Sequence, residues 1–174
     1  MTLVVNLFAG PGTGKSTTAA DVFSRLKRAG VNAELVHEYA KDLTWEERTN
    51  ALTFQPYVTA KQVWWVHRLL GKVEVIVTDS PILLGVVYRG EGYSDALEEW
   101  IFDVFRSWHT YNVFLTRGKR VAYQETGRSQ TYEQALDLDT RIRALLLGFS
   151  IPHSEFRSTV GGAVRITEEI LDRL

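Results

Sequence analysis

A nine-residue segment near the start of the chain, AGPGTGKST (Ala9–Thr17), combines three glycines with one lysine and several hydroxyl side chains. Glycines allow the backbone to turn tightly and to bring its N–H groups against anionic oxygens. Lys15 adds a positive charge, and Ser16 offers a hydroxyl ligand for Mg²⁺. A helix that begins near Gly14 would add the positive end of its dipole. The segment therefore predicts a site for the phosphate groups of a nucleotide.

The spacing from Ala9 through Gly14, Lys15 and Ser16 matches the phosphate-binding P-loop, with alanine where the strict pattern has glycine. The alanine is a minor departure, since a methyl group at the end of the strand lies outside the phosphate contacts. The alternative is a chance glycine-rich turn between a strand and a helix. The P-loop interpretation predicts that ATP contacts Gly10, Pro11, Gly12, Thr13, Gly14, Lys15, Ser16 and Thr17.

A second candidate is Asp79, which follows the apolar run 73–78 and precedes Ser80 and Pro81. A carboxylate at the carboxyl end of a strand beside the P-loop strand is placed to hold Mg²⁺, usually through water. The metal ligands predicted from the sequence are therefore Ser16 and Asp79. Asp79 also fits the N-cap of a helical segment from Ile82, and the two roles are compatible.

A third candidate is Glu38, in the sequence HEYAKD after the run 32–37. At the carboxyl edge of the sheet, Glu38 is placed to accept the proton that a substrate hydroxyl loses as it attacks the γ-phosphate. The alternative is a solvated loop carboxylate, and Glu38 and Asp79 could exchange the base and metal roles. Lys41 either holds a substrate phosphate or is simply exposed.

The segment 117–128 contains four basic residues and one acidic residue, with glycines at 118 and 127. Such a segment between a strand and a helix that opens near Thr131 suits a lid that closes on ATP and excludes water. The lid, about residues 117–130, would bring Arg117, Arg120 and Arg128 to the transferred phosphoryl group. The alternative is a solvated loop.

A further helix is expected between the second and third strands, and it carries amides and aromatic rings. Amides such as Gln55 and Gln62 can read base edges, and aromatic side chains stack on bases. The alternative is a helix with one core face and one solvated face. The four histidines of the chain show no metal-ligand spacing.

These residues require a scaffold that brings several strand ends together. Apolar runs at 3–9, 32–37, 73–79, 111–117 and, less clearly, 153–157 alternate with segments of helical periodicity. Nearly continuous apolar runs are typical of strands buried on both faces. We therefore expect a three-layer α/β/α fold with a five-stranded parallel sheet and flanking helices.

Composition narrows the class of protein. A chain of 174 residues with 45% hydrophobic residues predicts a single domain over 1–174. It has no cysteine, no run long enough to span a bilayer and no signal-peptide pattern, so we expect a soluble, cytoplasmic protein without membrane partners. A net charge of −1 argues against a general electrostatic surface for nucleic acid, but not against a local basic patch.

The segments FAGPGTGKST, ELVHEYAKD, VTDSP, FLTR with its basic GR-containing continuation, and ALDLDTRIRALL together resemble small P-loop kinases encoded by bacteriophages. These belong with polynucleotide, nicotinamide riboside, nucleoside and nucleotide kinases. The narrowest similarity is to phage kinases that phosphorylate 5-hydroxymethyluracil in DNA, a step toward hypermodified thymine. The resemblance implies a P-loop NTPase fold, ATP and Mg²⁺ at residues 12–17, a catalytic or metal-linked Asp79, an acceptor-side Glu38 and arginines within the lid.

The leading hypothesis is an ATP-dependent kinase whose acceptor is a hydroxyl of a nucleoside, a nucleotide or a modified base, with DNA among the candidate partners. If the chain is phage-encoded, its compartment is the cytoplasm of the infected host. The alternatives are a nucleoside, nucleotide or polynucleotide kinase, a P-loop NTPase or switch module, and a nucleotide-binding scaffold without turnover. The acceptor, the choice between ATP and GTP, and the oligomeric state are left open by the sequence.

Overall fold

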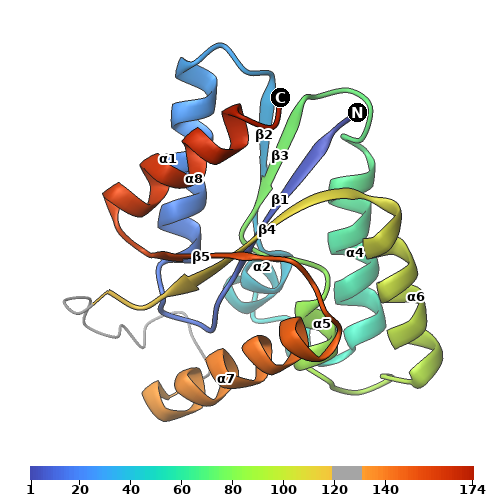
Figure 1. Ribbon diagram of the computed structural model, residues 1–174. Coiled ribbons are helices and arrows are strands. Elements are labelled where there is room, and N and C mark those ends of the chain that lie inside the picture. Colours follow the sequence, from blue (N-terminus) through green and yellow to red (C-terminus); the bar gives the residue numbers. More distant parts are fainter. Residues whose placement is uncertain (119–130) are drawn as a thin grey trace.

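Five parallel strands form one sheet at the centre of the protein, in the order β2-β3-β1-β4-β5 (Figure 1). The computed structural model describes residues 1–118 and 131–174. The strands are β1 (Leu3–Phe8), β2 (Ala33–Val36), β3 (Val75–Thr78), β4 (His109–Thr116) and β5 (Ser154–Arg157). Each predicted strand is present, and its ends lie within two residues of the expected ones.

The strand sequences are apolar because both faces of the sheet are covered. All six residues of β1 and all four of β3 are buried. Side chains alternate between the faces, so Val5 and Leu7 join the core under one helical layer, whereas Val4 and Phe8 join the cores under the other. This two-sided burial accounts for the continuous apolar pattern.

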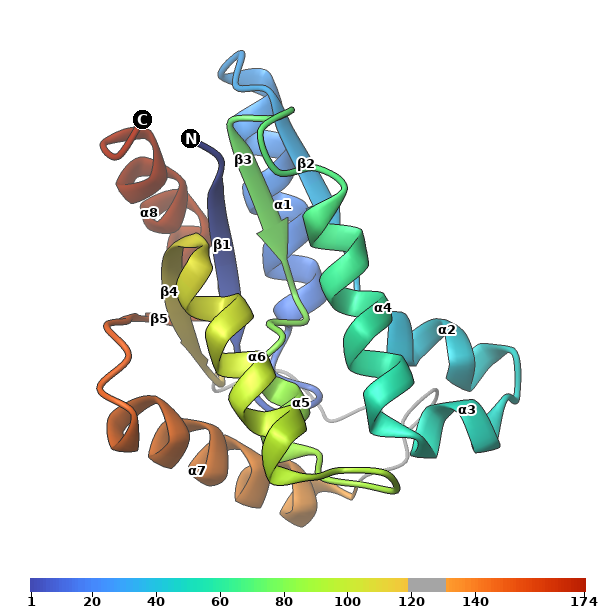
Figure 2. The same cartoon turned by 90° about the vertical axis from the view of Figure 1, so that its right-hand side faces the viewer.

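Helices form the two outer layers and also gather at one edge of the sheet. The longer helices are α1 (Lys15–Arg28), α4 (Gln55–His67), α6 (Asp95–Ser107), α7 (Tyr132–Gly148) and α8 (Val160–Leu171), and the shorter ones are α2 (Tyr39–Trp45), α3 (Thr49–Thr53) and α5 (Leu84–Val87). Helices α1 and α8 cover one face, and α4 and α6 cover the other (Figures 1 and 2). The three-layer α/β/α fold predicted from the sequence is confirmed.

The carboxyl ends of the strands meet at the edge where α2, α3, α5 and α7 gather (Figure 2). The P-loop follows β1, Asp79 follows β3, and Glu38 lies two residues beyond β2. Arg117 directly follows β4, the neighbour of β1 on its other side. The crevice outside the carboxyl ends of such a sheet is where ligands bind in open α/β folds.

A pair of asparagines interrupts the apolar centre of the sheet. Asn6 on β1 lies directly opposite Asn112 on β4, and its Nδ2 donates to Asn112 Oδ1 at 2.9 Å. Asn112 in turn donates through Nδ2 to the carbonyl oxygen of Pro152 at 3.1 Å. Both side chains are buried, so this amide link is shielded from water.

Among the described helices, none has both the length and the apolar sequence that crossing a bilayer requires.

Candidate active site

The segment between β1 and α1 forms an open turn that two left-handed glycines support. Gly12 has a φ of 76° and Gly14 a φ of 100°, a region that side chains with a Cβ rarely adopt. Thr13 is buried between them, and its hydroxyl donates to the carbonyl oxygen of Gly10 at 3.0 Å. The turn is therefore held in shape by its own sequence.

The start of α1 is suited to an anion. Gly14 occupies the N-cap position without any side-chain cap, and the first turn of the helix contains no acidic residue. Helix N-termini leave backbone N–H groups without intrahelical partners, and their dipole attracts negative charge. Ser16 and Thr17 are exposed in this first turn, where hydroxyls can meet a phosphate or its metal ion.

Lys15 lies against the inside of the P-loop. Its Nζ donates to the carbonyl oxygens of Ala9 at 2.8 Å and Gly10 at 3.3 Å. Burial lowers the pKa of the Lys15 ammonium, whereas the negative charges of Glu38 and Asp79 work in the opposite direction. The lysine thus shares one electrostatic environment with both predicted carboxylates.

Asp79 lies at the end of β3 and is 4% exposed. Its Oδ1 is buried, and no described residue offers it a hydrogen bond. The helix that follows begins at Leu84 with Leu83 as its N-cap, so Asp79 does not serve as the cap of that helix. A buried carboxylate oxygen without a protein donor fits a role as a ligand of a hydrated cation.

The described residues contain no group of three or more histidine, cysteine, aspartate or glutamate side chains able to hold a metal ion. A Mg²⁺ ion at this edge would therefore take its remaining ligands from phosphate oxygens and water, as Mg²⁺ commonly does. The assignment of Asp79 and Ser16 as its protein ligands stays a prediction.

Glu38 follows β2 and precedes the first residue of α2. It occupies the N-cap position of α2, but its side chain makes no capping bond. Burial raises the pKa of the Glu38 carboxyl, and the nearby charge of Asp79 raises it further, while Lys15 and Lys41 lower it. A partly buried carboxylate beside the P-loop lysine has the character of a general base.

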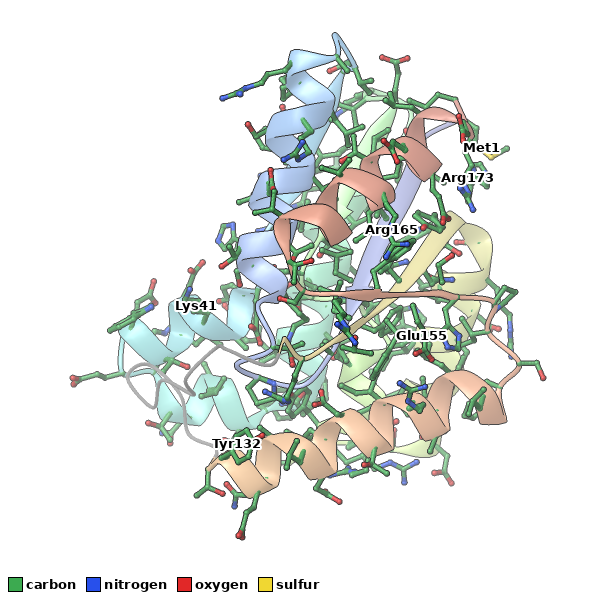
Figure 3. All side chains as sticks on the ribbon, turned by 60° about the vertical axis from the view of Figure 1, so that its left-hand side comes forward. Met1, Lys41, Tyr132, Glu155, Arg165 and Arg173 are labelled. Atoms are coloured by element: carbon green, nitrogen blue, oxygen red, sulfur yellow. The ribbon has the colours of Figure 1, made fainter. Side chains whose placement is uncertain are left out.

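Lys41 projects from α2 at the same edge of the sheet (Figure 3). Its side chain is exposed, and its charge lowers the pKa of Glu38. The structure thus places Lys41 beside the predicted acceptor-side carboxylate, and its proposed contact with a substrate phosphate stays a prediction.

Arg117 lies at the end of β4, where the sequence predicted it, but its guanidinium is bonded to protein groups. Nε donates to Asp139 Oδ2 at 2.6 Å, and Nη2 donates to the carbonyl oxygens of Pro11 at 2.9 Å and Ala135 at 3.2 Å. Arg117 therefore links α7 to the P-loop. Its predicted contact with the transferred phosphoryl group stays a prediction.

Asp139 on α7 is a site residue that the sequence analysis missed. Its Oδ1 accepts a hydrogen bond from the backbone N–H of Gly10 at 2.6 Å, while Oδ2 accepts from Arg117. Gly10 is also sterically confined, since an added Cβ would lie 2.6 Å from the carbonyl oxygen of Ala135. The weak signal available was a carboxylate beside the apolar stripe of α7.

Ser158, in the turn between β5 and α8, is a second missed contact. Its backbone N–H donates to the carbonyl oxygen of Thr116 at 3.0 Å. An added Cβ on Gly14 would collide with Ser158 Oγ, so this turn packs directly on the P-loop.

The remaining predicted lid contacts, Arg120 and Arg128, and most of the predicted lid lie outside the described residues. The helix that was expected to open near Thr131 begins at Tyr132. Thr131 caps it through a capping box, in which its hydroxyl accepts from the N–H of Gln134 and the Gln134 side chain accepts from the N–H of Thr131.

Comparisons with known proteins bear on the fold and the family of the chain. A solved structure of deoxyadenosine kinase from M. mycoides with bound dATP matches with a TM-score of 0.61 and 14% sequence identity, covering 97% of this chain and 99% of that one. At this identity the likeness shows a shared fold. No curated protein matches the sequence significantly. The model of the AAA domain family matches residues 4–161. This match spans most of the chain and includes the P-loop, Glu38 and Asp79, and the chain therefore belongs to the AAA domain family.

Proposed function

We propose that this protein is an ATP-dependent kinase that transfers the γ-phosphoryl group of ATP to a hydroxyl group of a nucleoside or nucleotide. The observation that carries the proposal is the position of Glu38 just beyond β2, at the same edge of the sheet where the P-loop follows β1 and Asp79 follows β3. A hydroxyl acceptor must lose a proton as it attacks, whereas a phosphate acceptor needs no base. The shared fold with deoxyadenosine kinase supports a nucleoside as the acceptor.

The proposed roles follow from the geometry of the carboxyl edge. The N–H groups at residues 12–16 bind the phosphates, and Lys15 turns from the carbonyl oxygens of Ala9 and Gly10 toward the β- and γ-phosphates. Ser16 and Asp79 would hold Mg²⁺, which supplies charge stabilisation at the phosphate oxygens. These groups hold the terminal phosphoryl group in line with the acceptor.

In the transfer step, the acceptor hydroxyl gives its proton to the Glu38 carboxylate as its oxygen bonds to the γ-phosphorus. The bond from this phosphorus to the bridging oxygen of ADP breaks, and ADP leaves with that electron pair. Partial burial of Glu38 raises the pKa of its carboxyl and makes its carboxylate a stronger base than an exposed one.

The test is an acceptor panel with γ-labelled ATP and Mg²⁺. The panel contains deoxyadenosine, the other nucleosides, mononucleotides and DNA that carries 5-hydroxymethyluracil, the narrower acceptor suggested by the resemblance to phage kinases. Label on a nucleoside or nucleotide supports the proposal, and label on the DNA instead moves the acceptor to the modified base. Fast release of inorganic phosphate without a labelled acceptor refutes the proposal in favour of an NTPase.

A further inference from the structure

One buried amide on α4 holds the backbone on both sides of Glu38. Gln62 is 4% exposed, and its two polar atoms face the chain between β2 and α2. Its Oε1 accepts a hydrogen bond from the N–H of Tyr39 at 3.1 Å, and its Nε2 donates to the carbonyl oxygen of His37 at 3.1 Å.

These two bonds fix the conformation of the residue between them. The carbonyl of His37 belongs to the peptide plane before Glu38, and the N–H of Tyr39 belongs to the plane after it. Rotation about φ or ψ of Glu38 must turn one of these planes, so a single planar amide group bonded to both restrains both angles. Glu38 has an extended conformation, with φ −75° and ψ 114°, directly before the helical residues of α2.

Gln62 also satisfies one of the open N–H groups at the start of α2. The first N–H groups of a helix have no intrahelical acceptor, and the N-cap side chain usually supplies one. The Glu38 side chain makes no capping bond, and Gln62 satisfies another member of this set, the N–H of Tyr39. The Glu38 carboxylate is therefore not engaged in capping α2, and it lies within the electrostatic reach of Lys15 and Asp79.

The amide is held in place by the core beneath α4. Val66, one helical turn beyond Gln62, is buried in the apolar cluster under the sheet, and Trp65 packs against both residues that flank Glu38. The ring of Trp65 lies 4.8 Å from that of His37 and 5.1 Å from that of Tyr39, between centroids. The packing of α4 against the sheet therefore fixes the position of Gln62 and, through it, the backbone of Glu38.

From this geometry we infer that Gln62 is a positioning residue that aims the Glu38 carboxylate at the acceptor hydroxyl, an inference that rests on the proposed function. We assign the amide to positioning and not to reading a substrate base, because it is 4% exposed and both of its polar atoms are bonded to backbone. Placement errors of about 1 Å in a catalytic group can cost 10²-fold in rate. Loss of Gln62 thus slows the chemical step and leaves the P-loop intact.

The test compares Gln62→Met with wild type, in the wild-type and in the Glu38→Gln background. Methionine keeps the length of the side chain and removes both hydrogen bonds. The matched control is Thr167→Val on α8, which removes a buried hydroxyl that donates only to its own helix, at Ala163 O. Steady-state kinetics give kcat and the KM for ATP, and thermal unfolding checks that each variant is folded.

We expect Gln62→Met to lower kcat by about 10- to 100-fold and to leave the KM for ATP unchanged. In the Glu38→Gln background, the same substitution should have no further effect on kcat. Thr167→Val should leave kcat unchanged. An equal loss in both backgrounds, or an unchanged kcat, overturns the positioning role.

If Gln62→Met does not fold, Gln62→Glu provides the second variant. This variant keeps an acceptor for the N–H of Tyr39 and loses the donor to the carbonyl of His37. We expect the same loss of kcat, confined to the background that contains Glu38. If kcat is not lowered in that background, the positioning role is overturned. A wild-type protein that labels no acceptor refutes the proposed function itself. If the wild type transfers phosphate and the Gln62 variants lower kcat equally in the wild-type and Glu38→Gln backgrounds, only the role of Gln62 is refuted.

Discussion

The carboxylate of Asp139 joins the P-loop to the end of β4, and its removal tests how strongly this link holds the site. Asp139→Ala eliminates the acceptor of the Gly10 N–H and the partner of Arg117, both bonded at 2.6 Å. A hydrogen bond to a charged group contributes about 1.5–3 kcal/mol, and breaking a buried ion pair costs about 3–5 kcal/mol. The Arg117 and Asp139 side chains are each 19% exposed. Solvent screens part of the pair, and Arg117 keeps its carbonyl acceptors, so we expect a loss of about 3 kcal/mol in the free energy of unfolding.

The assay is urea unfolding followed by tryptophan fluorescence, combined with calorimetric titration of ATP and Mg²⁺. Asp139→Ala should lower the unfolding midpoint and weaken nucleotide binding, because Gly10 loses the acceptor that holds its N–H. The control is Asp137→Ala, an exposed carboxylate on the same helix, which should change the free energy of unfolding by less than about 0.5 kcal/mol.

The double variant Arg117→Ala/Asp139→Ala sharpens the result. Each single substitution leaves a charge without its partner, so the double variant should lose less stability than the sum of the two single losses. A single Asp139→Ala loss below about 1 kcal/mol, or strict additivity in the double variant, would refute the conclusion that this pair braces the P-loop.

Three further predictions concern the proposed chemistry and the loop that supports it. Lys15→Ala should abolish phosphoryl transfer while leaving the fold intact, as measured by the labelled-ATP assay and circular dichroism. Glu38→Gln should lower kcat by about 10²–10⁴-fold. Burial raises the pKa of Glu38, so on acidification its carboxylate form is lost at a pH above the ordinary pKa of glutamate. The wild-type kcat should therefore fall on the acid side of the pH profile. Glu38→Gln should remove this acid-side decrease. Gly14→Ala should destabilise the protein by more than about 1 kcal/mol, since Gly14 has positive φ and the new Cβ would collide with Ser158; thermal unfolding without a shift would contradict this.

Most of the sheet could be predicted from the sequence because burial on both faces leaves a local pattern. Strand β1 is entirely apolar except for Asn6, and it leads directly into the P-loop glycines. The short helices α2 and α3 between Glu38 and Gln55 gave no comparable pattern, since they are too brief to show an apolar stripe and α3 buries none of its residues.

The positions of the candidate site residues could be predicted where they depend on local spacing. The P-loop and Asp79 belong to this class, because each depends on a strand end and its next few residues. Asp139 could not be found in this way, since its bond to Gly10 joins residues 129 positions apart. Arg117 was placed at the correct strand end, but the sequence could not indicate that carbonyl groups of the P-loop and α7 accept its hydrogen bonds.

The asparagine pair in the centre of the sheet has a consequence for the geometry of the candidate site. The P-loop follows β1 and Arg117 follows β4. The register between these two strands therefore sets the position of the P-loop relative to Arg117. Sliding one strand by a single residue would displace the two by about 3.3 Å and turn every side chain of that strand to the opposite face. It would also part Asn6 from Asn112 in a water-free interior, where an unbonded amide is costly. The hydrogen bond between Asn6 and Asn112 thus favours the native register of β1 and β4. Chains folded with a shifted register, in which the P-loop and Arg117 would be misaligned, are destabilised.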